Sequence, residues 1–338
     1  MNDISVKIGF WYDKNQRDLP WRHTQDAYLI WLSEIILQQT RVVQGMEYYL
    51  RFVERYPTVE ELAKADEDEV LKMWQGLGYY SRARNLHKAA RQVVETTKAF
   101  PRTYAELIKL KGVGPYTAAA IASFSSDERV AVLDGNVYRV LSRLFDIDTP
   151  IDSAKGQKDF LALASELLPT QGAGRHNQAM MELGALCCTP ASPQCAECPV
   201  AGHCLALAND TIGQRPVKAG KVKVRERFLQ YIIYIYEVSV WVHQRGEGDI
   251  WQGLWEFVLN EQDSRTEGAS FSIKHQLTHQ TLYADFIVQK VTDEKEAARL
   301  DEELQPKEYQ RISWLEWQKL AVPRLIDEAN RRIAEAWL

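Results

Sequence analysis

Four of the chain's five cysteines fall within one run near the middle of the sequence. Cys188, Cys195, Cys198 and Cys204 lie in CTPASPQCAECPVAGHC with the spacing C-x6-C-x2-C-x5-C. Free cysteine also packs as a small hydrophobe, but such clustering favours a metal site, because thiolates bind both zinc and iron–sulfur clusters. Zinc tetrads usually come as two close pairs. One close pair flanked by two single cysteines therefore favours a cubane cluster, with a four-Cys zinc site as the rival.

Glu34 is the first carboxylate in an unusual setting. It lies within DAYLIWLSEIILQQT (26–40), which has the composition of a helix and carries apolar residues on nearly all sides. A carboxylate there loses hydration, and its pKa should rise. Such a group is either paired for structural reasons or held as a general acid. The sequence leaves both possibilities open.

Asp134 is the second carboxylate in an unusual setting. In VAVLDGNVYRVLSRL (130–144) an apolar run ends in Asp134-Gly135-Asn136, and the pattern predicts a helix beginning with Val137. Asp134 fits the N-cap position of that helix. It could equally be a carboxylate presented at the mouth of a cleft.

Three further segments have residue types that suit nucleic acid. LKGVGPYTAAAIASF (110–124) has the helix-hairpin-helix pattern, in which Gly112 and Gly114 expose backbone N–H groups that can hold a phosphate. GLGYYSRARNLH (76–87) interleaves aromatic and basic residues, as stacking on bases requires, or else holds a core tyrosine pair under solvated arginines. Trp21-Arg22 follows a proline and is either packing with a surface charge or a pocket wall for a base.

The composition sets wider limits. A chain of 338 residues with 46% hydrophobic content suits two domains. The net charge of −5 argues weakly against nucleic acid, although phosphate contacts depend on local groups. We find no run of 18 apolar residues and no secretory pattern, so we expect no membrane partner. The few, clustered cysteines suit a reducing compartment.

The chain changes character after about residue 212. Up to that point it reads as an all-α region. Residues 213–227 (GQRPVKAGKVKVRER) are basic, contain Gly and Pro, and read as a linker. From 228 to 338 the sequence is rich in β-branched and aromatic residues and ends in a helical pattern, which predicts a separate α+β domain.

Taken together, WLSEIILQQT, GLGYYSRARNLH, GVGPYTAAA, LDGNV and the cysteine spacing resemble, in order and over essentially the full length, the MutY family of adenine DNA glycosylases. The resemblance implies a multidomain protein. Residues 1–212 would form an all-α catalytic region, with a six-helix barrel at about 26–134 and an iron–sulfur module at about 1–25 and 135–212. Residues 228–338 would form a Nudix-like (MutT-like) domain, which GLWEF (253–257) matches.

One position separates this family from its relatives of the endonuclease III type. Bifunctional pyrimidine glycosylases have a lysine nucleophile two residues after the second hairpin glycine, where this chain has Tyr116. The C-terminal domain lacks the G-x5-E-x7-R-E-x2-E-E box, so we expect no diphosphate hydrolysis. The alternatives are a pyrimidine-lesion glycosylase/lyase, a non-enzymatic iron–sulfur DNA-binding protein and a Nudix hydrolase on a helical module.

The resemblance also implies a function: excision of adenine opposite 8-oxoguanine or guanine in double-stranded DNA by a monomer in the cytoplasm, associated with the nucleoid in a bacterium. Cys188, Cys195, Cys198 and Cys204 would hold a [4Fe–4S] cluster. Glu34 would be the general acid and base, and Asp134 would stabilise an oxocarbenium ion or capture it covalently. The resemblance further places Tyr116 and Asn136 near the sugar, and Trp21, Arg22, Leu37 and Gln178 around adenine. Gln39 and Tyr79 would lie near 8-oxoguanine, Thr278 and His279 in a reading loop, and Thr40 among the substrate-binding residues.

Overall fold

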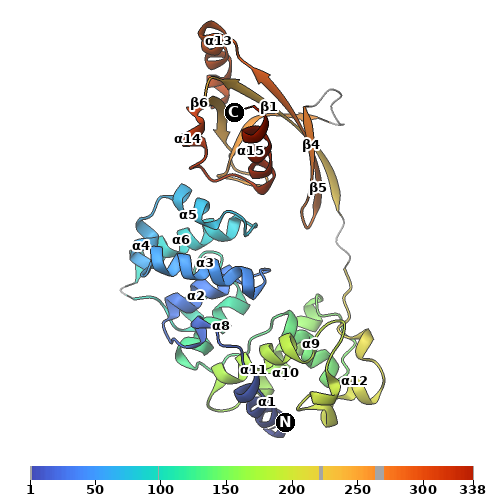
Figure 1. Cartoon of the computed structure of the whole chain (residues 1–338). Helices are drawn as coiled ribbons and strands as arrows, with labels where there is room; N and C mark the ends of the chain where they lie inside the picture. Colours follow the sequence, from blue (N-terminus) through green and yellow to red (C-terminus); the bar gives the residue numbers. More distant parts are fainter. Residues whose placement is uncertain (1, 98, 221–223, 263–269, 338) are drawn as a thin grey trace. The chain divides into compact units, whose positions relative to one another are not determined.

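The structure is a computed structural model that describes residues 2–97, 99–220, 224–262 and 270–337. It divides into two compact units, drawn in Figure 1. The first unit comprises Met1–Ala63 and Lys88–Gly220, and the second comprises Lys64–His87 and Lys221–Leu338. The domain boundaries given above stay a prediction.

The first unit is helical, and no strand occurs among its described residues. This confirms the all-α prediction. Its helices are α1 (Asn2–Asn15), α2 (Ala27–Ile36), α3 (Val42–Arg55), α4 (Val59–Lys64), α7 (Tyr104–Leu107), α8 (Pro115–Ser126), α9 (Gly135–Leu144), α10 (Ala154–Leu167), α11 (Ala173–Leu186) and α12 (Leu205–Ala208), with α6 (Ser81–Thr96) entering from the second unit. Short 3-10 turns are η1 (Pro20–Arg22), η2 (Cys195–Glu197), η3 (Ala201–His203) and η4 (Ile212–Gln214).

Small residues determine how closely these helices approach. Ala118, Ala119 and Ala120 are buried on α8, where α2 packs against it. Gly184 on α11 lies directly against α9, and a Cβ atom there would stand 2.6 Å from the Cβ of Asn136. Real Cβ atoms do not approach so closely, so glycine is required for this packing. The contact fixes the position of α9 relative to α11.

The second unit is built on a six-stranded mixed sheet in the order β4-β5-β1-β3-β2-β6. The strands are β1 (Arg225–Tyr236), β2 (Ser239–Gln244), β3 (Trp255–Gln262), β4 (Phe271–Gln276), β5 (Gln280–Lys290) and β6 (Gln310–Ser313). The unit also contains α5 (Glu67–Trp74), α13 (Glu294–Leu304), η5 (Gln305–Lys307), α14 (Trp314–Trp317) and α15 (Arg324–Ala336). This confirms the predicted α+β class.

Alternation along the central strand β1 places side chains on both faces of this sheet. Tyr231 and Ile233 join the core that α15 covers, whereas Ile232 joins the cluster around α13. β1 pairs in parallel with β5, so that Tyr231 faces Phe286, and the two rings stack with centroids 5.1 Å apart. Both faces of the sheet are therefore covered by helices.

Three local differences from the sequence interpretation bear on the site. The helix predicted for 26–40 ends at Ile36, and Gln39 adopts a left-handed backbone conformation with φ +55°. The helix after Asp134 begins at Gly135, not at Val137. β1 begins at Arg225, inside the predicted linker, of which residues 221–223 lie outside the described structure. None of the described helices is long and apolar enough to span a membrane.

Candidate active site

A cavity of about 870 Å³ in the first unit brings together ten of the residues singled out from the sequence. They come from η1, the end of α2, the start of α8 and α9, and the middle of α11. The ten are Trp21, Arg22, Glu34, Leu37, Gln39, Thr40, Tyr116, Asp134, Asn136 and Gln178. Segments up to about 150 residues apart in sequence therefore meet around one space.

Glu34 lies on the inner wall of this cavity with only 8% of its surface exposed. Its Oε2 accepts a 2.7 Å hydrogen bond from the hydroxyl of Tyr116, a neutral partner. Burial raises the pKa of Glu34 to about 7, and the nearby Asp134 adds to the rise, while the Tyr116 hydrogen bond and Arg22 oppose it. A carboxyl group with such a pKa can carry a proton near neutral pH.

Asp134 is the N-cap of α9, as its sequence position predicted. Its Oδ1 accepts from the Val137 backbone N–H and its Oδ2 from the Asn136 side-chain amide, both at 2.7 Å. Burial raises the pKa of Asp134, against the lowering effect of these hydrogen bonds and of Arg139. The cap and the cleft positions left open above are thus the same position. One carboxylate ends a helix and also lines the cavity.

Arg139 is a positioning residue that the sequence analysis did not single out. This buried side chain donates from Nη2 to the Asn136 amide oxygen and to the Gly184 carbonyl, and from Nε to the Cys188 carbonyl, each at 2.7 Å. Because the Asn136 oxygen faces Arg139, its NH2 group faces Asp134. The only signal in the sequence is the i, i+3 spacing of Asn136 and Arg139 on one helix.

Glu182 was also missed, although it is 1% exposed and lines the cavity. Arg17 and Arg22 each form two hydrogen bonds with its carboxylate, at 2.7–3.0 Å. Burial alone would raise the pKa of Glu182, but the bonds from the two arginines outweigh it and lower the pKa to about 2. Arg22 is thereby fixed at the cavity wall. No local sequence pattern connects residues 160 or more positions apart.

The hairpin glycines lie immediately before α8. Gly112 has φ +75°, a left-handed conformation that favours glycine, and Gly114 is the N-cap residue of the helix. A Cβ atom at Gly114 would meet nothing within 4 Å. The backbone at this helix N-terminus is thus open to an approaching group such as a phosphate.

The four clustered cysteines surround a small cavity of about 30 Å³. Arg143 donates to the Cys188 sulfur at 3.4 Å, whereas Cys187 is buried and donates to the Gln194 carbonyl at 3.4 Å. No group of three His, Cys, Asp or Glu side chains among the described residues is gathered closely enough for a single ion. Zinc requires thiolates about 2.3 Å from one point. The four thiols line one small space, and four thiols are a donor set that fits an iron–sulfur cluster.

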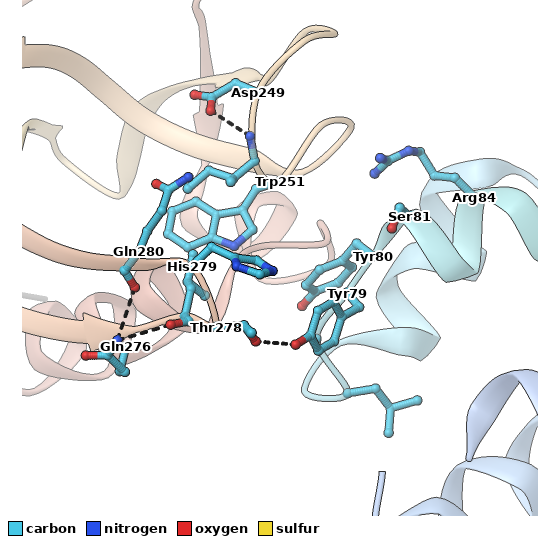
Figure 2. A pocket seen from close by; sticks show the side chains of 14 residues that line it. Tyr79, Tyr80, Ser81, Arg84, Asp249, Trp251, Gln276, Thr278, His279 and Gln280 are labelled. Carbon is cyan, nitrogen blue, oxygen red and sulfur yellow. Dashed lines mark hydrogen bonds between the residues drawn. The ribbon is translucent and has the colours of Figure 1, made fainter. Parts of the chain in front are cut away.

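A separate cavity of about 410 Å³ lies in the second unit and is shown in Figure 2. Tyr79, Thr278 and His279 line it, together with Trp251 and Tyr80. The Tyr79 hydroxyl is hydrogen-bonded to the Thr278 hydroxyl, and Tyr79 has φ +47°. The residues predicted to recognise the opposing base are thus divided, because Gln39 and Thr40 line the first cavity.

Comparison with known proteins finds a family match for each of the two parts of the chain. Residues 32–166 match the HhH-GPD superfamily of base excision DNA repair proteins, and residues 230–332 match the NUDIX domain. A thermostable thymine-DNA glycosylase aligns with TM-score 0.57 and 29% identity over 61% of this chain and 95% of its own. A trapped endonuclease III–DNA covalent intermediate aligns with TM-score 0.53 at 21% identity over 61% and 95%, and shows the fold alone. The helical unit is therefore that of a helix-hairpin-helix base excision glycosylase.

Relatives in sequence define the family within that class. The chain is 38% identical to an adenine DNA glycosylase of Arabidopsis thaliana over 79% of this chain and 50% of the relative. It is 35% identical to that of Buchnera aphidicola from Schizaphis graminum over 73% and 72%, and 44% identical to that of Homo sapiens over 58% and 38%. The chain belongs to the adenine DNA glycosylase family of DNA repair enzymes. Its match spans half the length of the Arabidopsis relative.

Proposed function

We propose that this protein is a monofunctional glycosylase that removes adenine mispaired with 8-oxoguanine or guanine in duplex DNA. The observation that carries the proposal is the pair of buried carboxyl groups, Glu34 and Asp134, in one cavity with different hydrogen-bond partners. Two carboxyl groups in different environments can divide acid and anionic roles between them.

The reaction requires adenine to leave the base stack, because the glycosidic bond is inaccessible inside the duplex. Glu34 gives its proton to the imidazole-ring nitrogen of adenine. The bond between C1′ and the base then breaks, and its electron pair leaves with the base. Asp134, as the carboxylate, stabilises the positive sugar or forms an ester with it. Glu34, now ionised, takes a proton from the water that completes hydrolysis.

Tyr116 determines the type of product. Its hydroxyl hydrogen-bonds Glu34 at the position where a lyase would have its lysine. Without an amine at that position, no Schiff base forms with the sugar, and the strand stays intact. Asn136 holds the Asp134 carboxylate in place, and Trp21, Arg22, Leu37 and Gln178 enclose the adenine.

Recognition of the opposing base belongs to the second cavity. The Thr278 hydroxyl and the His279 ring can hydrogen-bond a purine edge, and Tyr79 can stack on or between bases. Gln39 and Thr40 would contact the same base pair from the catalytic unit. The N–H groups at Gly112 and Gly114 would hold the backbone phosphate. The protein would act as a monomer on DNA in the cytoplasm.

Cys188, Cys195, Cys198 and Cys204 would hold a [4Fe–4S] cluster. When bound, such a group would supply four iron atoms, each bonded to one of these cysteine thiolates, and would so tie one loop together; the proposed reaction uses no redox step. Arg143 faces the thiols and donates to one of them. Cys187, with its own acceptor at Gln194, is the spare cysteine.

The test is single-turnover excision on duplexes that hold adenine opposite 8-oxoguanine, with strand breaks scored before and after alkali. We expect the wild type to release free adenine and to give strand breaks only after alkali. Glu34→Gln and Asp134→Asn should release almost no adenine. Glu95→Gln, at an exposed position on α6, is the matched control and should behave as wild type. Breaks before alkali would indicate a lyase. Binding without excision by the wild type would indicate a non-enzymatic cluster protein.

A further inference from the structure

A second large cavity in the first unit lies behind the active site. It measures about 800 Å³ and is formed by η1, the end of α8 and the start of α11, with Arg102 at its edge. Arg22, Phe124 and Gln178 line both this cavity and the active-site cavity. These three side chains therefore border both spaces, and we call them the wall. We refer to the second space as the rear cavity.

The three side chains of this wall are held in place to different degrees. Arg22 is fixed by Glu182, as described above. Gln178 is held by one hydrogen bond, in which the Tyr12 hydroxyl donates to its amide oxygen at 2.7 Å. Phe124 is half-buried in the last turns of α8. Rotation of Gln178 or Phe124 to another side-chain rotamer would open the wall without moving a helix.

The far side of the rear cavity is polar and open to solvent. Gln25, Arg102 and Arg175 on its lining are exposed. Guanidinium planes such as those of Arg102 and Arg175 stack on planar bases.

We propose that the excised adenine leaves through the rear cavity while the DNA is still bound. This inference rests on the proposed excision of adenine. After the bond to C1′ breaks, the sugar stays covalently attached to the DNA strand and, in the proposed mechanism, beside Asp134 in the active-site cavity. The base would have to pass that sugar to leave by the way it entered. A neutral planar purine can pass between Phe124 and Gln178 and stack on the exposed Arg102 or Arg175 guanidinium on its way to solvent.

The experiment follows two products in one turnover, with excess enzyme and a duplex that carries radiolabelled adenine opposite 8-oxoguanine. Alkali quenching measures abasic sites, rapid filtration measures free adenine, and a competitor duplex measures DNA dissociation. Wild type should release adenine as abasic sites form and before the DNA dissociates. Gln25→Trp narrows the opening of the rear cavity from an exposed position. This variant should form abasic sites at a rate within about twofold of wild type. It should release adenine about tenfold more slowly, which corresponds to a barrier about 1.4 kcal/mol higher.

Lys158→Trp is the matched control, because this exposed residue of α10 lines neither cavity. Thr24→Trp narrows the same opening and provides a second test of the proposal if Gln25→Trp folds poorly. The proposal is overturned if adenine leaves both tryptophan variants as fast as abasic sites form. Release of adenine only when the DNA dissociates would equally overturn it. Absence of abasic sites in the wild type would instead contradict the proposed function.

Discussion

Replacing Glu34 by glutamine should stabilise the protein while removing its activity. The pKa of Glu34 is about 7 in the folded protein, against 4.5 for an ordinary glutamate. Between these values the folded protein holds a proton that the unfolded chain has lost, so raising the pH favours unfolding. Glutamine has the same shape and cannot ionise, and its amide oxygen can still accept from Tyr116.

The pKa difference sets the magnitude. At about 1.4 kcal/mol per pH unit between the two pKa values, ionisation of Glu34 costs the folded state roughly 3 kcal/mol at about pH 8 and roughly 1 kcal/mol at about pH 5. We therefore expect Glu34→Gln to raise the thermal midpoint of the helical unit on the order of 5 °C at about pH 8. The gain at about pH 5 should be much smaller.

The assay is thermal unfolding followed by circular dichroism in parallel at the two pH values, beside the excision assay. Glu182→Gln is the matched control, because the pKa of this neighbouring buried carboxylate is lowered to about 2. Its stabilising effect is present above pH 4.5, so its loss should destabilise the protein at both pH values. Our reasoning is refuted if Glu34→Gln leaves the midpoint at pH 8 unchanged or lowers it. An equal gain at both pH values would also refute it.

Three further variants test the site. Tyr116→Phe removes the hydrogen bond that lowers the pKa of Glu34. The pH at which single-turnover excision falls to half its maximum should therefore rise by about one unit. An unchanged pH profile would contradict this prediction. Arg139→Met should reduce excision on the order of a hundredfold, because the Asn136 amide loses the hydrogen bond that orients it. Helix content should stay unchanged, and Arg139→Lys should restore part of the activity. Excision by Arg139→Met at the wild-type rate would exclude a positioning role. If Cys198 is a ligand of the proposed cluster, Cys198→Ser should lose the visible absorbance of that cluster and make the cysteine loop more sensitive to proteolysis. A variant that keeps both properties would show that Cys198 is not a ligand.

The sequence predicted best what is encoded locally. Asp134 could be assigned as an N-cap because capping depends on a few neighbouring residues. The raised pKa of Glu34 followed from apolar residues on its own helix. The length of that helix was overestimated because the turn at Gln39, with its left-handed backbone, carries no Gly or Pro to mark it.

What the sequence could not predict depends on contacts between distant segments. In the sequence Glu182 looks like an ordinary helical glutamate. Its role depends on ion pairs with Arg17 and Arg22, which belong to the N-terminal segment. The parallel pairing of β1 with β5 joins strands separated by more than 40 residues, and alternation alone does not specify a partner. The rear cavity likewise exists only where η1, α8 and α11 meet.

The contact between Gly184 and Asn136 has a consequence for inherited variation. Position 184 touches neither of the two carboxyl groups proposed for catalysis, yet a single added methyl group there would displace the residue that orients Asp134. Because the added methyl group must displace Asn136, we expect Gly184→Ala to lose the proposed adenine excision. Surveys that rank variants by distance from the reacting atoms would overlook it, and screening for mutation rate in growing cells would reveal it.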